Sequence, residues 1–234
     1  MEHLKSVWYS QLAPNSFCKL KQLKIEFCNE LSVLVPPYVL NKLQNLEIVT
    51  VASCATLEVV FETQGFKKDG ERQTKLEMQL RTLSLEHLQI LKHIWSGNPN
   101  ESFKFQNLCI LKVIECNTLN HVLPLSVAKE LQHLQELYIE ECGIEIIVAQ
   151  DEMAGTVPIL IFPELTSLSF QDLTQLQSFY HGSHILDCPA LRYVDILHCD
   201  KLELFMPKSL NYRDNIPVDT LPLLSIEKVQ FTSQ

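Results

Sequence analysis

Glycine and clustered positive charge are both scarce in this chain of 234 residues. Its six glycines are scattered and neither GxxxxGKS nor GxxxxGKT occurs, so it lacks that phosphate loop for cradling ATP or ADP. Its 19 Lys and Arg stand against 28 Asp and Glu, a net charge of −9, and no basic cluster exceeds Lys67-Lys68 near Arg72. Because a phosphate backbone is bound by concentrated positive charge, we expect no nucleic acid partner, and we also expect no cofactor.

Long apolar runs are missing as well. No run approaches the length of a membrane-spanning helix, and the opening MEHLKSVWYSQL lacks the basic and apolar regions of a signal peptide. With 46% hydrophobic residues the chain can nevertheless bury a substantial core. We therefore expect a soluble, cytoplasmic protein without a membrane span.

Eight cysteines raise the question of a metal or redox site, above all in CPALRYVDILHCDKLELF at 188–205. There is no CxxC pair, and an intracellular chain of this size keeps reduced thiols and needs no disulfides. The segment His181-Gly182-Ser183-His184 resembles a metal-binding pair but has no third ligand fixed nearby, which favours a turn. No nucleophile and base can be assembled either, so we expect no metal site, no catalytic residues and no enzyme activity.

A repeat explains the cysteines. Apolar residues recur at offsets of 0, 3, 6, 8, 11, 14 and 17 in seven rows that start near 17, 43, 77, 105, 131, 162 and 188. The average spacing of about 28 residues is typical of leucine-rich repeats. Offset 11 carries a buried cysteine in five rows and Leu88 or Leu173 in the other two, which indicates a compact apolar position rather than a ligand. The cysteine ladder is Cys28, Cys54, Cys116, Cys142 and Cys199. The other three, Cys18, Cys109 and Cys188, lie at or near row starts and are expected to be buried packing residues.

Each row predicts one short strand, because its two central apolar residues alternate with outward-pointing ones. The expected fold is α/β: a curved leucine-rich-repeat solenoid with a parallel β-sheet on the concave face and irregular turns and short helices on the convex face. We expect one domain over 1–234, with about seven full repeats, partial repeats at both ends and no nucleotide-binding domain.

A longer period lies over the short one. Residues 34–54 align without a gap with residues 122–142, an offset of 88, which indicates tandem blocks of three repeats. In the second block, Val127, Leu131 and Leu134 follow Pro124 at helical spacing, so a short helix or helical turn is expected within 126–137. The inserts at 62–75 and 149–158 are expected to be polar loops.

The pattern FxxLxxLxIxxCxxLxxLF, with residues 123–152 and 162–205, resembles the C-terminal leucine-rich-repeat region of plant coiled-coil nucleotide-binding disease-resistance proteins (NLR proteins). That resemblance implies a protein-protein interaction module in plant defense. Its partner would be a pathogen effector, a guarded host protein or the receptor's own nucleotide-binding domain, which it would help to keep inactive. The missing phosphate loop leaves two readings open, a fragment of a larger receptor or a truncated gene product.

F-box substrate receptors of ubiquitin ligases are the alternative, because they also carry cysteine-containing leucine-rich repeats. Their repeats are more uniform, with a threonine or aspartate, glycine and leucine after the cysteine, whereas this chain has CNTLN, CATLE and CDKLE at spacings of 26 to 34 residues.

The outward strand positions are the candidate partner-binding surface, since partners usually dock on the sheet of such a solenoid. Ile110, Ile114 and Tyr138 lie beside Glu136 and Glu140, as in an apolar patch with an acidic rim, although these side chains could equally stabilise the sheet itself. The full candidate set is Lys24, Glu26, Thr50, Glu86, Ile110, Lys112, Ile114, Glu136, Tyr138, Glu140, Tyr193 and Asp195.

Overall fold

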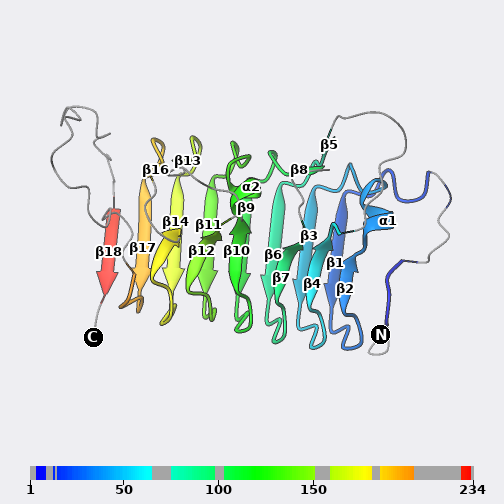
Figure 1. Cartoon of the computed structure of the whole chain (residues 1–234), viewed down its shortest axis with the longest axis horizontal. Coiled ribbons are helices and arrows are strands. Elements are labelled where there is room, and N and C mark those ends of the chain that lie inside the picture. The colour runs from blue at the N-terminus through cyan, green and yellow to red at the C-terminus, as the bar shows by residue number, and fades with distance from the viewer. Residues whose placement is uncertain are drawn as a thin grey trace.

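The computed structural model describes residues 4–8, 13, 15–64, 75–97, 103–150, 159–180, 185–202 and 228–232. Its main feature is an eight-stranded parallel sheet whose strands follow one another in chain order, side by side in one row (Figure 1). The strands are β1 (Gln22–Glu26), β3 (Ile48–Ala52), β6 (Thr82–Glu86), β9 (Ile110–Ile114), β11 (Glu136–Glu140), β14 (Ser167–Gln171), β17 (Tyr193–Leu197) and β18 (Lys228–Thr232). The predicted solenoid with a parallel sheet is confirmed.

Buried and outward-pointing side chains alternate along β3, β6, β9, β11 and β17 as the repeat requires. In β9, Leu111 and Val113 point into the core and are fully buried, while Ile110, Lys112 and Ile114 point outward and stay partly exposed. Neighbouring strands pair without any shift, so that Leu111 lies beside Leu137 and Val113 beside Ile139. One continuous core therefore runs through the stack.

Behind the sheet, shorter elements repeat with the longer period. Two three-stranded parallel sheets form a flank: β2 (Val33–Val35), β4 (Val59–Glu62) and β7 (His93–Ser96), then β10 (His121–Pro124), β12 (Ile146–Ala149) and β15 (Ser178–Tyr180). Two-stranded pairs precede later repeats: β5 (Leu76–Glu77) with β8 (Phe103–Lys104), and β13 (Ile159–Ile161) with β16 (Ile185–Asp187). The flank is thus interrupted once, between β7 and β10.

The two helices in the described part of the chain are single turns at equivalent places in their blocks. They are α1 (Pro37–Leu40) and α2 (Leu125–Ala128), which are 88 residues apart in sequence, and each follows directly on a proline. The expected helix within 126–137 is therefore shorter and starts earlier than the spacing indicated. Leu131 and Leu134 are buried, but they flank the turn at residues 132 and 133 rather than lying on a helical face.

The ladder cysteines occupy equivalent buried positions just after five of the strands. Each Sγ lies near the carbonyl oxygen two residues earlier, at 3.2 to 3.6 Å, within reach of a weak S–H hydrogen bond. All eight cysteines are free. Cys18 was predicted to be a buried packing residue near a row start, and this is wrong: it is exposed, because it lies in a turn before the first strand.

A left-handed residue immediately precedes every ladder position. Its φ is between 48° and 56° in all seven repeats, although none of these residues is glycine. In six repeats its backbone N–H donates to the carbonyl of the last strand residue in the next repeat, at 2.9 to 3.2 Å. This hydrogen bond extends the sheet ladder by one step and offsets the steric cost of the conformation. The row, called the left-handed row below, is Phe27, Ser53, His87, Glu115, Glu141, Asp172 and His198.

Two repeats depart locally from the common pattern. In the third, Glu77 is exposed and Met78 fills the buried starting position, with its N–H donating to the Lys104 carbonyl. In the fifth, which is one residue short, a Cβ built on Gly143 would lie 2.2 Å from the Asn117 carbonyl oxygen. Only glycine permits so close an approach between these neighbouring turns.

Substitutions at Glu141 measure how much free energy of unfolding is lost by holding a non-glycine residue at positive φ. Its side chain is exposed, so replacement disturbs little packing. We expect Glu141→Gly to be more stable than Glu141→Ala by about 1 kcal/mol, and Glu141→Val to be less stable than Glu141→Ala by a similar amount, because a β-branched residue is the least suited to φ near +50°. Urea denaturation checks the order; an alanine variant at least as stable as the glycine variant contradicts it.

Substitution of Gly143 tests the close approach of the two turns. We expect Gly143→Ala to lower the free energy of unfolding by about 2 to 4 kcal/mol, because backbone must move to admit the methyl group. Asn117→Ala is the control, since it keeps the carbonyl oxygen that the methyl group would meet. It should cost far less alone, and it should not rescue Gly143→Ala. Rescue in the double variant would show that the clash is with the side chain.

Candidate functional site

The outward-pointing residues of β1 to β17 form one surface, called the sheet face below. It has three columns, because each strand contributes its first, third and fifth residue and the strands pair in register. All twelve candidate residues lie on it. Among them Lys24, Glu26, Glu136 and Tyr193 are exposed, and the others are partly buried by their neighbours.

Tyr138 lies in the middle column of this face. Its direct neighbour on β9 is Lys112, whose Nζ lies over the tyrosine ring at 5.6 Å from the centroid. On the other two columns Ile110 lies beside Glu136, and Ile114 beside Glu140. Apolar and charged side chains therefore alternate here, and the arrangement differs from an apolar centre enclosed by an acidic rim.

The tyrosine hydroxyl donates to Glu140 Oε2 at 2.5 Å. Burial raises the pKa of Tyr138 to about 12, helped by the hydrogen bond to Glu140 and by the negative charges of Glu140 and Asp195. The phenol is thus a neutral donor over the physiological range of pH. This pins the ring in one orientation, with one side covered by Lys112.

Further contacts link neighbouring strands across the face. Lys112 Nζ lies 3.6 Å from Glu86 Oε1, and the Ser84 hydroxyl donates to the same carboxylate at 2.9 Å. Toward the other end, Gln171 Nε2 donates to Asp195 Oδ2 and to Ser169 Oγ, both at 3.3 Å. These contacts hold polar side chains in fixed positions over five strands, as a binding surface requires.

Sequence reasoning missed the left-handed row as part of this surface. Two histidines there pair with acidic residues of a neighbouring repeat: His87 Nδ1 lies 2.9 Å from Glu115 Oε2 on the next repeat, and His198 Nδ1 lies 2.8 Å from Asp172 Oδ1 on the preceding one. All four side chains are between 36% and 47% exposed, so they border the sheet face and can contact a partner. The sequence did contain a signal for this row: its members share one offset in the repeat, directly before the cysteine-ladder position.

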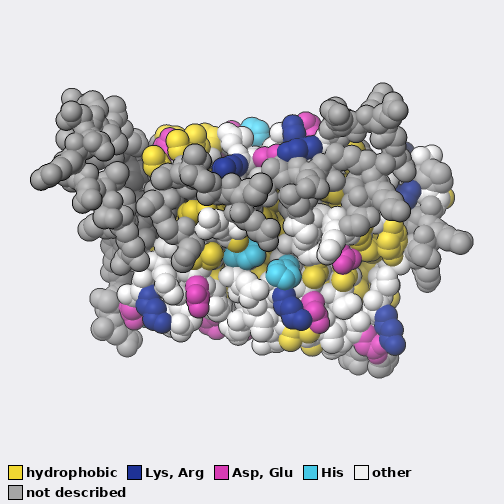
Figure 2. All heavy atoms as spheres, viewed as in Figure 1, with side chains coloured by type: hydrophobic (Ala, Val, Ile, Leu, Met, Phe, Trp, Pro, Cys, Tyr) yellow, Lys and Arg dark blue, Asp and Glu magenta, His cyan; other side chains and the backbone are white. Residues whose placement is uncertain are grey.

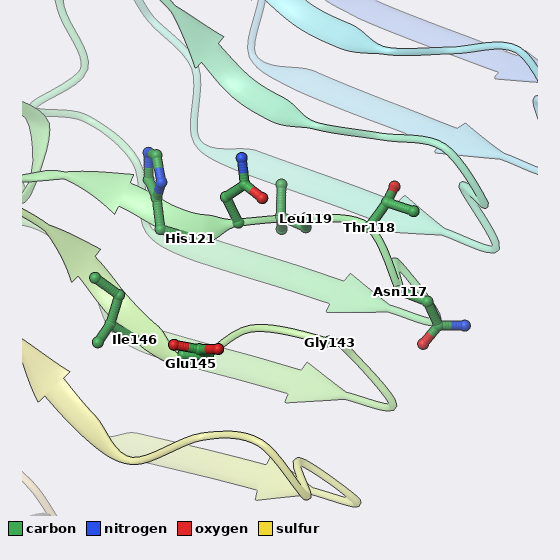
Figure 3. Close-up of a pocket in the computed structure, with 8 residues that line it drawn as sticks. Asn117, Thr118, Leu119, His121, Gly143, Glu145 and Ile146 are labelled. Carbon is green, nitrogen blue, oxygen red and sulfur yellow. The ribbon is translucent and has the colours of Figure 1, made fainter.

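A shallow hollow of about 530 Å³ opens on the flank, between the fourth and fifth repeats. Asn117 and Gly143 come from neighbouring turns, His121 is the first residue of β10 and Glu145 directly precedes β12, and the last two side chains do not point toward one another (Figure 3). The His121 ring lies 6.3 Å from that of His93 across the interrupted flank. Burial, and to a lesser extent the neighbouring His93, lowers the pKa of His121.

The space-filling view of the molecule shows histidine side chains near the middle of one face and basic side chains beside acidic ones (Figure 2). Pairs such as Lys92 with Glu58, at 2.8 Å, join equivalent positions of adjacent repeats. Being exposed, these pairs contribute little to stability, on the order of 0 to 1 kcal/mol each.

In the described part of the chain, no cluster of metal-ligating side chains is found. Within it, no three His, Cys, Asp or Glu side chains form a group that could hold a metal ion. The His181–His184 segment lies outside the described residues. Among the helices described, none has the length and apolar character needed to span a membrane.

Comparison with known proteins places these features in a family. The family model for leucine-rich repeats of plant disease resistance proteins of the RPS2-like type matches residues 1–143, more than half of the chain. No curated protein and no solved structure matches the chain. The matched part contains β1 to β11 and four of the five ladder cysteines. The chain therefore belongs to the RPS2-like leucine-rich-repeat family of plant disease resistance proteins.

Proposed function

We propose that this chain is the protein-recognition region of a cytoplasmic plant immune receptor of the NLR type, from its C-terminal leucine-rich repeats. Its sheet face would bind a pathogen effector or a guarded host protein. In the absence of that signal, the same surface would contact the receptor's own nucleotide-binding domain and help to keep it inactive. The single observation that supports this most is the sheet face itself, an ordered and side-chain-diverse surface on a family member of this kind.

The dimensions of the sheet face favour a protein over a small molecule. Parallel strands lie about 4.8 Å apart, so the seven strands from β1 to β17 cover roughly 30 Å. That width matches the patch buried by one partner in a standard protein-protein interface. By contrast, the hollow on the flank is open and shallow, and its polar groups do not converge on one point.

The composition of the face also suits recognition. Half-buried Tyr138 and exposed Tyr193 supply rigid aromatic surface, and charged groups lie around them. Aromatic residues and arginines dominate the binding energy of most interfaces, and each tyrosine loses little conformational entropy on binding. Family membership favours a receptor module over a ubiquitin-ligase substrate receptor.

The test is site-directed crosslinking in plant leaf cells. A photoreactive amino acid is placed at Ser84 on the sheet face and, as the matched control, at Ser178 in β15 on the flank. Proteins captured from the Ser84 position are produced in pure form and titrated against the 234-residue chain by calorimetry. We expect Tyr138→Ala to weaken such a complex by about 2 kcal/mol, roughly 30-fold in Kd.

The control substitution is Lys201→Ala, whose Nζ contacts only Gln175 Oε1 at the exposed surface among the described residues. It should leave the Kd within about twofold. A captured protein whose affinity ignores every sheet-face substitution but falls with flank substitutions would refute this function.

A further inference from the structure

Negative charge is concentrated in one part of the sheet face. Over the five strands from β6 to β17, with the left-handed residue after each, only Lys112 is basic, whereas seven residues are acidic. Even with Arg81 and Arg192, which precede β6 and β17, acidic residues outnumber basic ones by seven to three. The seven are Glu86, Glu115, Glu136, Glu140, Glu141, Asp172 and Asp195.

The first two strands do not share this character. Around β1 and β3, the same positions hold one lysine and one glutamate, Lys24 and Glu26, which pair at 3.0 Å. The other positions there are uncharged. The surface is therefore polarised along the stack, with a neutral end and an acidic end, which overall composition alone would not produce.

The acidic end already binds one cation from within the chain. Lys112 lies over one side of the Tyr138 ring and reaches Glu86 at 3.6 Å. A cation over an aromatic face gains about 0.5 to 2 kcal/mol, depending on its exposure to water. Its neighbour in the middle column on β14 is Ser169, a short side chain that is buried by the residues around it.

Beyond Ser169, in the same column, lies Asp195 on β17. Its Oδ2 accepts from Gln171, but its buried Oδ1 has no hydrogen-bond partner among the described residues. A buried carboxylate oxygen without a donor is costly, so the site is stabilised by any donor that reaches it. Tyr138 and Asp195 are separated by two strand spacings, about 9.6 Å. The Gln171 amide now lies in this space, bonded to Ser169 and Asp195, and Ser169 beneath it is buried. A planar cation that displaces this amide can stack on the ring and bond to the carboxylate.

We propose that this acidic end of the sheet face binds a basic protein surface, and that an arginine of the partner displaces the Gln171 amide and enters between Tyr138 and Asp195, above Ser169. The guanidinium stacks on the free side of the tyrosine ring and donates to the Asp195 carboxylate, while Glu136, Glu140 and Glu141 attract neighbouring cations. Arginine fits better than lysine, because its planar group both stacks and donates in a fork. The inference rests on the proposed function and names the chemistry of the partner.

The experiment uses the intact chain and fluorescent peptides. The probe is a nine-residue peptide of alternating arginine and serine, compared with lysine-serine and glutamate-serine peptides, with binding followed by anisotropy at about 50 and about 150 mM NaCl. We expect the arginine peptide to bind, the lysine peptide to bind several-fold more weakly, and the glutamate peptide not to bind.

Two double variants with the same change of net charge separate a site from general attraction. Glu140→Gln with Asp195→Asn should weaken the arginine peptide at least about tenfold. Glu58→Gln with Glu164→Gln is the control, since these residues pair with Lys92 and His133 elsewhere; it should change the Kd less than about twofold. Ser169→Arg places a guanidinium in the site from within the chain, so it should block the peptide while circular dichroism shows an unchanged fold.

Equal weakening by both double variants, or equal binding of the arginine and glutamate peptides, would overturn the proposal. So would full binding to the Ser169→Arg variant. If a protein captured at Ser84 binds the sheet face yet ignores Glu140→Gln with Asp195→Asn, only the charge inference fails. If binding of both protein and peptide ignores all sheet-face substitutions, the proposed function fails as well.

Discussion

The hydrogen bond that six of the seven left-handed residues donate to the strand of the next repeat holds the coils in a common register. At this point the chain leaves the strand and turns inward, so that the following side chain enters the core. Without that turn, Cys116 or Leu173 could not reach the buried ladder position. The strain of seven non-glycine residues at positive φ is thus tied to the burial of seven apolar groups. Register, core and sheet face all depend on the same local geometry.

The fold could be predicted from the sequence because its determinants are periodic. Alternation of inward and outward side chains fixes each strand, and fixed offsets between rows fix their pairing. The left-handed row escaped prediction because its signal is conformational: Phe27, Glu115 and Glu141 are poor candidates for positive φ, and only the hydrogen bond to the next repeat makes it acceptable. Gly143 shows the same limit, since its need for glycine comes from a carbonyl in another repeat.

The sequence predicts which residues form the sheet face, but it does not predict all of the contacts between their side chains. Once rows are aligned, Lys112 and Tyr138 share one offset and must be neighbours, so their pairing follows from the repeat. The rotamers that put Lys112 over the ring and the hydroxyl on Glu140 do not follow, because each depends on several side chains at once. The difference in charge between the neutral and the acidic end is also present in the aligned rows. It becomes visible when charges are counted repeat by repeat rather than over the whole chain.

The acidic end carries an energetic cost that a purely structural sheet would not need. Like charges on adjacent strands repel one another, and Glu115, Glu141 and Asp172 occupy consecutive rungs of the left-handed row. His87 and His198 cover the two outer members, which leaves Glu141 between two carboxylates. A cationic partner would remove this repulsion and, by mass action, stabilise the folded chain. The part of the surface least favourable to the isolated solenoid is therefore the part with most to gain from binding, whereas the charge pairs of the flank are already satisfied within the chain.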